Sequence, residues 1–103
     1  MIRYTTPTLQ LIIEADLTGA DVYATFRQAC RELTKQNPTA TVDEGVTTLS
    51  IPFTQEETAD FADNLPVSVQ VNWITHGGTR NATEIATFRT FANLLDEVIA
   101  YGN

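Results

Sequence analysis

Histidine and cysteine, which serve most often as a catalytic base or nucleophile, are scarce in this sequence. His76 is the only histidine and Cys30 the only cysteine among 103 residues. His76 stands beside Gly77-Gly78, which predicts a turn, whereas a catalytic imidazole needs a rigid setting and an orienting acid. Cys30 has no Cys-x-x-Cys partner, so we expect a partly buried, unreactive thiol. We therefore predict no catalytic residue, no metal site and no cofactor, since zinc needs several His or Cys ligands.

Four carboxylates stand close together at Glu56, Glu57, Asp60 and Asp63. Such a cluster could bind a metal or carry out acid chemistry, but the residue before it points to another role. Thr54 and Glu57 have the spacing of a capping box, in which each side chain bonds the other's backbone N–H, and this predicts a short helix over about 55–62. On that helix we expect the acids to form a solvated face, with the early ones favoured by the helix N-terminus.

Trp73 is the only tryptophan. An exposed indole could serve as a platform for a carbohydrate or a peptide, because its flat ring stacks on apolar surfaces. Here it continues the alternation of Val67, Val69 and Val71, so we expect it to face the core. A ligand-binding module thus stays open as the alternative function.

Trp73 and His76 both belong to a long β-hairpin predicted over 66–91, the strongest structural signal in the sequence. The first strand, from Pro66, alternates valine with polar residues, and Gly77-Gly78 supplies the turn. The second strand is expected over 82–91, which is rich in Thr, Ile and Phe. This hairpin should position most of the candidate functional residues.

The pairing register of this hairpin can be predicted from its hydrophobic pattern. A two-residue turn at 77–78 would place Val71 opposite Glu84 and so bring a carboxylate to the apolar face. A three-residue loop over 77–79, with its third residue in the left-handed region, instead sets Val71 opposite Ile85 and Trp73 opposite Thr83.

Phe88 is the first candidate for a partner surface in this register. It would lie on the face opposite Ile85 and Phe91, unless a bulge intervenes between Ile85 and Phe88. An exposed phenylalanine on a strand is typical of an interaction site. With His76 and Arg80 near the hairpin tip, it makes up our tentative interaction surface of Phe88, His76 and Arg80.

The remaining elements follow from alternation and turn residues. Strands are predicted over 8–14, 22–27, 39–42 and 46–53, and a short helical turn over 93–99. The segment 28–36 could be helical, but we favour an extended segment with a bend, since two strands flanking a turn would pair locally. The result is a mainly β fold with antiparallel strands.

Length and charge limit the classes of protein that fit. With 103 residues and a net charge of −7, the chain is expected to be a single soluble domain over 1–103 with a core of its own. Its six Lys and Arg residues are scattered, which argues against nucleic acid as a partner. No stretch has the apolar length to span a bilayer and no secretory signal is evident, so we expect no membrane partner and synthesis in the cytoplasm.

Several stretches together carry a family resemblance. They are 1–9, Asp21 to Gln28, Leu49 to Thr58 with its Thr-Gln-Glu-Glu-Thr sequence, Val69 to Trp73 beginning Val-Gln-Val, and 93–95. In this order they resemble small proteins encoded in prophages and mobile elements of Gram-positive bacteria. More distantly they resemble the N-terminal β-sandwich domain of phage baseplate upper proteins.

The resemblance implies an immunoglobulin-like antiparallel β-sandwich that acts as a virion structural or adaptor protein in tail or baseplate assembly. Its partners would be other phage-type structural proteins or further copies of itself, reached through protein contacts rather than catalysis. It would be found in the cytoplasm of the bacterial host, or in the virion if the element is a functional phage. The alternative function is a non-catalytic carbohydrate- or peptide-binding β-sandwich module.

Overall fold

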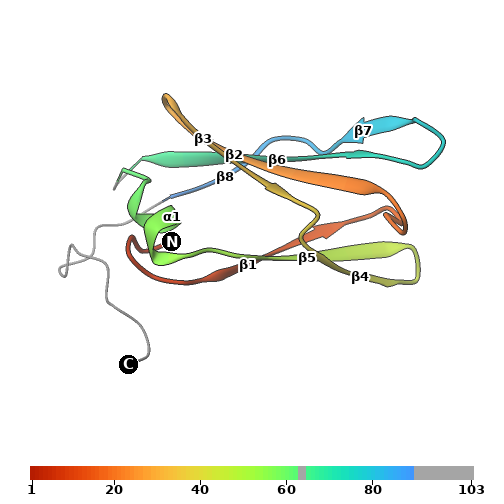
Figure 1. Ribbon diagram of the computed structural model, residues 1–103, viewed down its shortest axis with the longest axis horizontal. Coiled ribbons are helices and arrows are strands. Elements are labelled where there is room, and N and C mark those ends of the chain that lie inside the picture. Colours follow the sequence, from red (N-terminus) through yellow and green to blue (C-terminus); the bar gives the residue numbers. More distant parts are fainter. Residues whose placement is uncertain (63–64, 90–103) are drawn as a thin grey trace.

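The computed structural model describes residues 1–62 and 65–89, and within them the chain is mainly β (Figure 1). Alternating apolar and polar residues form most of the strands, as expected for sheets with one buried face. The elements are β1 (Thr8–Ile13), β2 (Asp21–Gln28), β3 (Arg31–Gln36), β4 (Thr39–Asp43), β5 (Val46–Pro52), α1 (Gln55–Ala59), β6 (Pro66–Ile74), β7 (Arg80–Ala82) and β8 (Ala86–Arg89). The predicted mainly β, antiparallel fold is confirmed.

Two antiparallel sheets form the two layers of a sandwich. One has the strand order β1-β5-β4, and the other has the order β3-β2-β6-β7, with β8 also paired to β6. Figure 1 shows the first sheet below the second, with α1 at one end of the layers and the β4–β5 and β6–β7 loops at the opposite end. Each sheet therefore has two edge strands within the described residues: β1 and β4 in one, β3 and β7–β8 in the other.

The core lies between the sheets and follows the predicted alternation. Val22, Ala24 and Phe26 of β2 are buried against Leu49 and Ile51 of β5. The remaining buried apolar residues are Ile13, Leu17, Phe53, Phe61, Val67, Val69 and Val71. Burial of these side chains removes their apolar surface from water, which is the main stabilising contribution to a domain of this size.

The ambiguous segment 28–36 is a hairpin, so the helical alternative is wrong. β2 and β3 are paired antiparallel, and the pair next to the turn is Gln28 with Arg31. Ala29 and Cys30 therefore form a two-residue turn. Ala29 has a φ of 52°, the positive value that the first position of a type II′ turn requires. The prediction of a partly buried Cys30 is also wrong: the thiol is exposed because the turn carries it away from the sheet.

The capping box is confirmed, and the helix that it starts is shorter than predicted. Thr54 Oγ1 accepts from the N–H of Glu57, whose carboxylate accepts from the N–H of Thr54. α1 ends at Ala59, with Asp60 as its C-cap, rather than near residue 62. The next two residues are held elsewhere, since Phe61 is buried in the core and Ala62 hydrogen bonds to Gln28.

The loop of the β6–β7 hairpin has the predicted length but not the predicted position. Thr75 N donates to Thr79 O at 2.9 Å, so the three loop residues are His76, Gly77 and Gly78. Gly78 has a φ of 86°, whereas the predicted loop would have placed Thr79 in that left-handed region. A β-branched residue is strongly disfavoured there, and glycine is not. Trp73 accordingly lies opposite Asn81 rather than Thr83, and the predicted pairing is wrong.

The predicted return strand is divided by a bulge. Asn72 pairs with Ala82 and Val69 pairs with Ala86, so the three residues 83–85 lie across from the two residues 70–71 of β6. The extra residue of the bulge therefore lies within 83–85 and not between Ile85 and Phe88. Val71 O still accepts a backbone hydrogen bond, from Thr83 N, so the predicted pairing of Val71 with Ile85 is also wrong.

The bulge reverses the roles expected for two apolar residues. It brings Phe88 opposite the buried Val67, and the Phe88 ring packs edge to face on Phe26 with centroids 6.3 Å apart. Phe88 is therefore half-buried and faces the core, so it is not the exposed partner residue that the tentative surface required. Ile85 is 64% exposed instead.

Three predicted features lie outside the described residues: Asp63 of the carboxylate cluster, Phe91, and the helical turn over 93–99. Within 1–62 and 65–89, no helix is long and apolar enough to cross a bilayer.

Candidate interaction surface

The three residues of the tentative interaction surface do not come together. His76 is exposed in the β6–β7 loop, and Arg80 is exposed at the start of β7, where Nη2 donates to Asn72 Oδ1 at 3.3 Å. Phe88 faces the core further along the same sheet. His76 and Arg80 thus share one end of the hairpin, and no surface joins them to Phe88.

β1 offers the most regular unprotected strand edge among the described residues. Its six residues, Thr-Leu-Gln-Leu-Ile-Ile, contain no charge and no proline, and within 1–62 and 65–89 its one strand partner is β5. Ile12 points out of the sandwich and is 72% exposed. Backbone N–H and C=O groups on the outer side of such a strand can pair with another chain.

A groove runs between β1 and the β7–β8 strands, on what we call the open side of the sandwich. Its volume is about 670 Å³, within the range of ligand and peptide sites. The apolar lining comes from both sheets and includes Leu11 and Ile13 of β1 and Val69, Val71 and Trp73 of β6. Trp73 is half-buried and packs against the core, so the prediction that it faces inward is confirmed, and it also lines this groove.

The opposite rim of the groove is formed by the bulge between β7 and β8. At the bulge, the N–H of Val71 donates to the side-chain Oγ1 of Thr83 at 3.1 Å instead of to a backbone carbonyl of the neighbouring strand. The Gln70 side chain donates to Thr83 O at 2.9 Å. Bulges and very short strands protect a sheet edge from pairing, so this rim is a poorer template for an added strand than β1.

Both charged residues that line the groove are acidic. Glu14 follows β1 on one rim and Glu84 lies in the bulge on the other. Neither forms an ion pair with the described part of the chain. The groove therefore combines an apolar floor with a negative rim, which favours an apolar ligand that carries positive charge.

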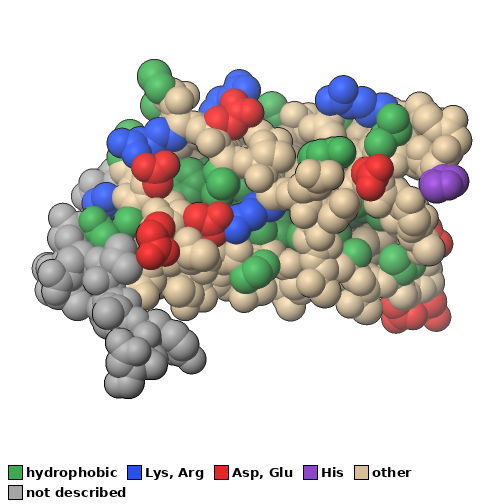
Figure 2. Space-filling view, viewed as in Figure 1, with side chains coloured by type: hydrophobic (Ala, Val, Ile, Leu, Met, Phe, Trp, Pro, Cys, Tyr) green, Lys and Arg blue, Asp and Glu red, His purple; other side chains and the backbone are tan. Residues whose placement is uncertain are grey.

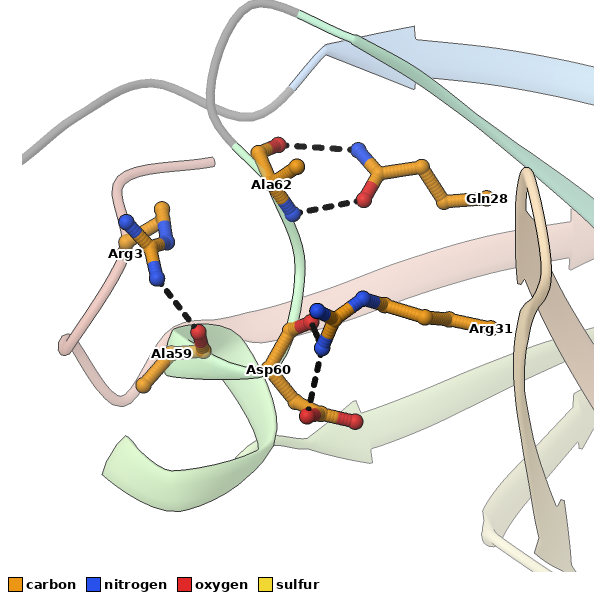
Figure 3. Close-up of polar contacts among 6 residues, drawn as sticks. All are labelled: Arg3, Gln28, Arg31, Ala59, Asp60 and Ala62. Atoms are coloured by element: carbon orange, nitrogen blue, oxygen red, sulfur yellow. Dashed lines mark hydrogen bonds and ion pairs between the residues drawn. The ribbon is translucent and has the colours of Figure 1, made fainter.

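On the other side of the sandwich, the segment 54–62 lies against β3 and covers the space between the sheets. We call this side the closed side. Gln28 at the end of β2 is only 2% exposed. Its amide forms a cyclic pair with the backbone of Ala62, donating to the carbonyl at 2.9 Å and accepting from the N–H at 2.6 Å (Figure 3). It also donates to Leu65 O at 3.2 Å. One buried side chain thus satisfies the backbone where the chain crosses between the sheets.

Two further contacts fasten α1 to the start of the chain. Arg3 donates to Ala59 O at 2.7 Å (Figure 3). Thr58, which is fully buried, donates to Thr5 O at 2.8 Å. These bonds join residues more than 50 positions apart, so they fix the crossover in three dimensions.

Two ion pairs complete the closed side. Arg31 bonds both the carboxylate and the backbone carbonyl of Asp60 (Figure 3), and Lys35 Nζ lies 2.6 Å from each carboxylate oxygen of Glu57. Lys35 also lies over the Phe53 ring, 5.5 Å from its centroid. Lys35 is largely covered, whereas the Arg31–Asp60 pair stays exposed. Charged side chains on edge strand β3 discourage pairing of that edge with another chain.

The Glu57 carboxyl shows the electrostatic effect of this pairing. Partial burial, the largest single influence, acts to raise its pKa, but the hydrogen bonds from Lys35 and from the backbone of Thr54 together outweigh burial. The pKa of Glu57 is therefore held below its ordinary value, and the carboxylate is stabilised by folding.

The carboxylate cluster is a structural feature in this setting. The hollow beside it is only about 210 Å³ and is lined by β3 and the segment 56–61. Figure 2 shows cationic and anionic side chains next to one another on this face. Within 1–62 and 65–89 no group of His, Cys, Asp and Glu has the arrangement of a metal site.

Sequence reasoning missed the groove and the partners of Gln28, Arg31 and Lys35. Each of these contacts joins residues 22 to 37 positions apart, and no local pattern specifies such pairs. The absence of charge in 8–13, set beside the charges of 31–36, was the one available signal that the two edges differ.

Comparisons with family models, with curated proteins and with solved structures find no match to this chain.

Proposed function

We propose that this chain is a phage-type virion structural or adaptor protein, which takes part in tail or baseplate assembly through protein contacts. The sequence resemblance supplies the class, and the immunoglobulin-like form of the sandwich is part of the same proposal. Two antiparallel sheets with one short crossover helix are compatible with it.

One observation supports a role in protein contacts more than any other. β1 presents an uncharged strand edge beside an apolar groove, whereas the opposite side is closed by hydrogen bonds and ion pairs. Unprotected edges favour aggregation and are normally blunted. An edge left available therefore suits a protein that works in an assembly, in the virion or in the host cytoplasm before assembly.

The gene neighbourhood and co-assembly test this proposal together. We expect the gene to lie among genes for tail or baseplate components, and the purified chain to co-elute with at least one neighbouring product in size-exclusion chromatography. A chain that stays monomeric with all of these products, encoded by a gene with no phage genes around it, would refute the proposal.

The alternative function is a carbohydrate- or peptide-binding module. The orientation of Trp73 bears on which of these two ligands such a module would bind. Trp73 lies opposite the buried Val22, so its ring faces the groove rather than forming an outward platform. This orientation favours a peptide over a flat sugar. Because Trp73 is the sole tryptophan, its fluorescence reports directly: soluble glycans should leave the emission unchanged, and a saturable glycan-induced shift would favour the carbohydrate module.

A further inference from the structure

We propose that the groove on the open side accepts an extended segment of a partner protein, which pairs with β1 as an added strand and carries apolar residues alternating with Lys or Arg. This inference rests on the proposed function and names the chemistry of the partner. It makes β1 the template strand and the β7–β8 rim the opposite wall.

β1 is chosen because the other edges are protected. β3 has three charged residues among six, at Arg31, Glu32 and Lys35, and two of them are paired with the segment 54–62. β7 has three residues and leads into a bulge. β4 is short and exposed along its whole length, and none of its residues lines a described groove. β8 borders the same groove through Ala86, but it has four residues and follows the bulge. Within 1–62 and 65–89, β1 is therefore the longest regular edge beside an apolar groove.

The groove selects for alternating apolar side chains. A strand added to β1 would direct every second side chain to the same face as Leu11 and Ile13, towards Val71 and Trp73. Ile13, Val69 and Val71 are already buried, so the added side chains would cover the exposed parts of the half-buried Leu11 and Trp73. The other side chains would continue the outer face, next to the exposed Ile12.

Charge identifies the occupant as another protein. Glu14 and Glu84 stand on the two rims with no cation near them in the groove lining, so Lys or Arg in the incoming strand would be attracted. A second copy of the chain carries a net charge of −7, and the sequence 90–103 holds Asp96 and Glu97 but no Lys or Arg. Neither complements a negative rim, whereas a basic segment of a different protein does.

Labelled nine-residue peptides test the proposal on the full chain. One peptide alternates Val with Lys and Thr, a second has Glu in place of Lys, and a third carries N-methyl groups that block backbone pairing. We expect saturable binding of the basic peptide alone, with amide chemical-shift changes concentrated in 8–15. Equal binding of the acidic or N-methylated peptide, or shifts concentrated in β3 or β4, would overturn the proposal.

Charge reversal at the rim supplies a matched pair of protein variants. Glu14→Lys combined with Glu84→Lys should weaken binding of the basic peptide by about 2- to 30-fold, as two exposed ion pairs would. Asp43→Lys combined with Glu44→Lys, at the exposed end of β4 and in the turn that follows, changes the net charge by the same amount away from the groove and should leave binding nearly unchanged. Equal effects of the two changes would show that net charge, and not the rim, attracts the peptide.

Hydrogen exchange of the free chain distinguishes the other occupants. Amides on the outer side of β1 should exchange fast at every protein concentration. Protection that grows with concentration would identify a second copy as the occupant, and protection at all concentrations would identify the chain's own sequence; either result overturns the proposal. Failure of peptide binding leaves the gene-neighbourhood test intact, and binding with unrelated neighbours would refute only the phage assignment.

Discussion

The two sides of this sandwich differ in how the edges of the two sheets are covered. On the closed side, the segment 54–62 crosses between the sheets and is held to β2 and β3 by Gln28, Arg31 and Lys35. On the open side, β1 and the β7–β8 strands face each other across a groove, and no described segment crosses it. One edge is closed by the chain itself, and the other is left available.

The difference follows from what each segment must satisfy. A crossing segment brings backbone N–H and C=O groups into a region without ladder partners, so side chains must bond them. A hairpin such as β6–β7 satisfies most of its own backbone, and side chains bond the backbone at its bulge, through Thr83 and Gln70, and at its loop, through Thr75. The closed side is therefore held by many specific polar bonds. The open side is held by the burial of apolar side chains and by the hydrogen bonds of one bulge.

The largest expected effect comes from breaking the closed side at Gln28. Gln28→Ala removes both hydrogen bonds from its buried side chain to the half-buried backbone of Ala62, and it should lower the free energy of unfolding by about 2–4 kcal/mol. Gln10→Ala, on the exposed outer face of β1, is the matched change on the open side and should cost less than about 0.5 kcal/mol. Urea denaturation measures both. Comparable losses would mean that the two sides contribute alike.

A pair of threonines gives a smaller and finer comparison. Thr58→Val removes the buried bond to Thr5 O and should destabilise the chain by about 1–2 kcal/mol. Thr83→Val removes the acceptor for the Val71 N–H in the bulge, where water can reach more easily, and about 0.5–1 kcal/mol is expected. Thermal unfolding of the two variants checks the order, and a larger loss for Thr83→Val would contradict it.

Much of this comparison could be predicted from local sequence. The alternation in β2, β5 and β6 gave the buried faces, and Thr54 with Glu57 gave the start of α1, because these features depend on neighbours a few residues away. The length of the β6–β7 loop was also correct. A hydrophobic pattern and a capping box are local signals: they predicted the buried faces and the start of α1, but not the register of the β6–β7 hairpin or the end of the helix.

The wrong or missing predictions concern backbone conformation at one turn and contacts between residues far apart in the sequence. Hydrophobic matching between the two strands favours a loop over 77–79, but the left-handed third position of the loop needs glycine. Gly78 fills that position, so the loop is 76–78. The wrong loop position also hid the bulge and turned Phe88 from a core residue into a surface candidate. The contacts of Gln28 and Lys35 could not be predicted, since they depend on how the crossover lies against β3.

Acid should weaken the closed side through Glu57. Its pKa is lower in the folded chain than its ordinary value of 4.5, so the stabilisation is fully present above about pH 4.5 and is lost as the pH falls through the folded pKa. Asp16, in the turn after β1, has its pKa lowered by hydrogen bonds from the side chain and backbone of Thr18, so it adds a similar dependence outside the closed side.

Urea denaturation at several pH values between about 3 and 6, the range in which carboxyl groups titrate, separates the contributions of Glu57 and Asp16 to stability. Glu57→Gln should flatten part of the pH dependence and leave the part due to Asp16. Glu56→Gln, on the same helix but outside the Lys35 pair, should leave the slope unchanged. An unchanged slope in Glu57→Gln would show that the ion pair contributes nothing to the closed side.

The smallest effects are expected at the turns that end the two hairpins. Ala29, beside the closed side, and Gly78, at the tip of β6–β7, both have positive φ values. Ala29→Gly should stabilise the chain by about 0.5 kcal/mol, because release of backbone strain slightly exceeds the added entropy of glycine in the unfolded chain.

Gly78→Ala should destabilise the chain by about 1 kcal/mol. A methyl group at Gly78 would meet nothing within 4 Å, so the whole effect would come from backbone conformation and not from a clash. Differential scanning calorimetry on both variants should therefore show melting shifts of opposite sign. Shifts of the same sign would mean that the two turns do not share the strain that their φ values indicate, and that contacts around the β2–β3 turn outweigh it on the closed side.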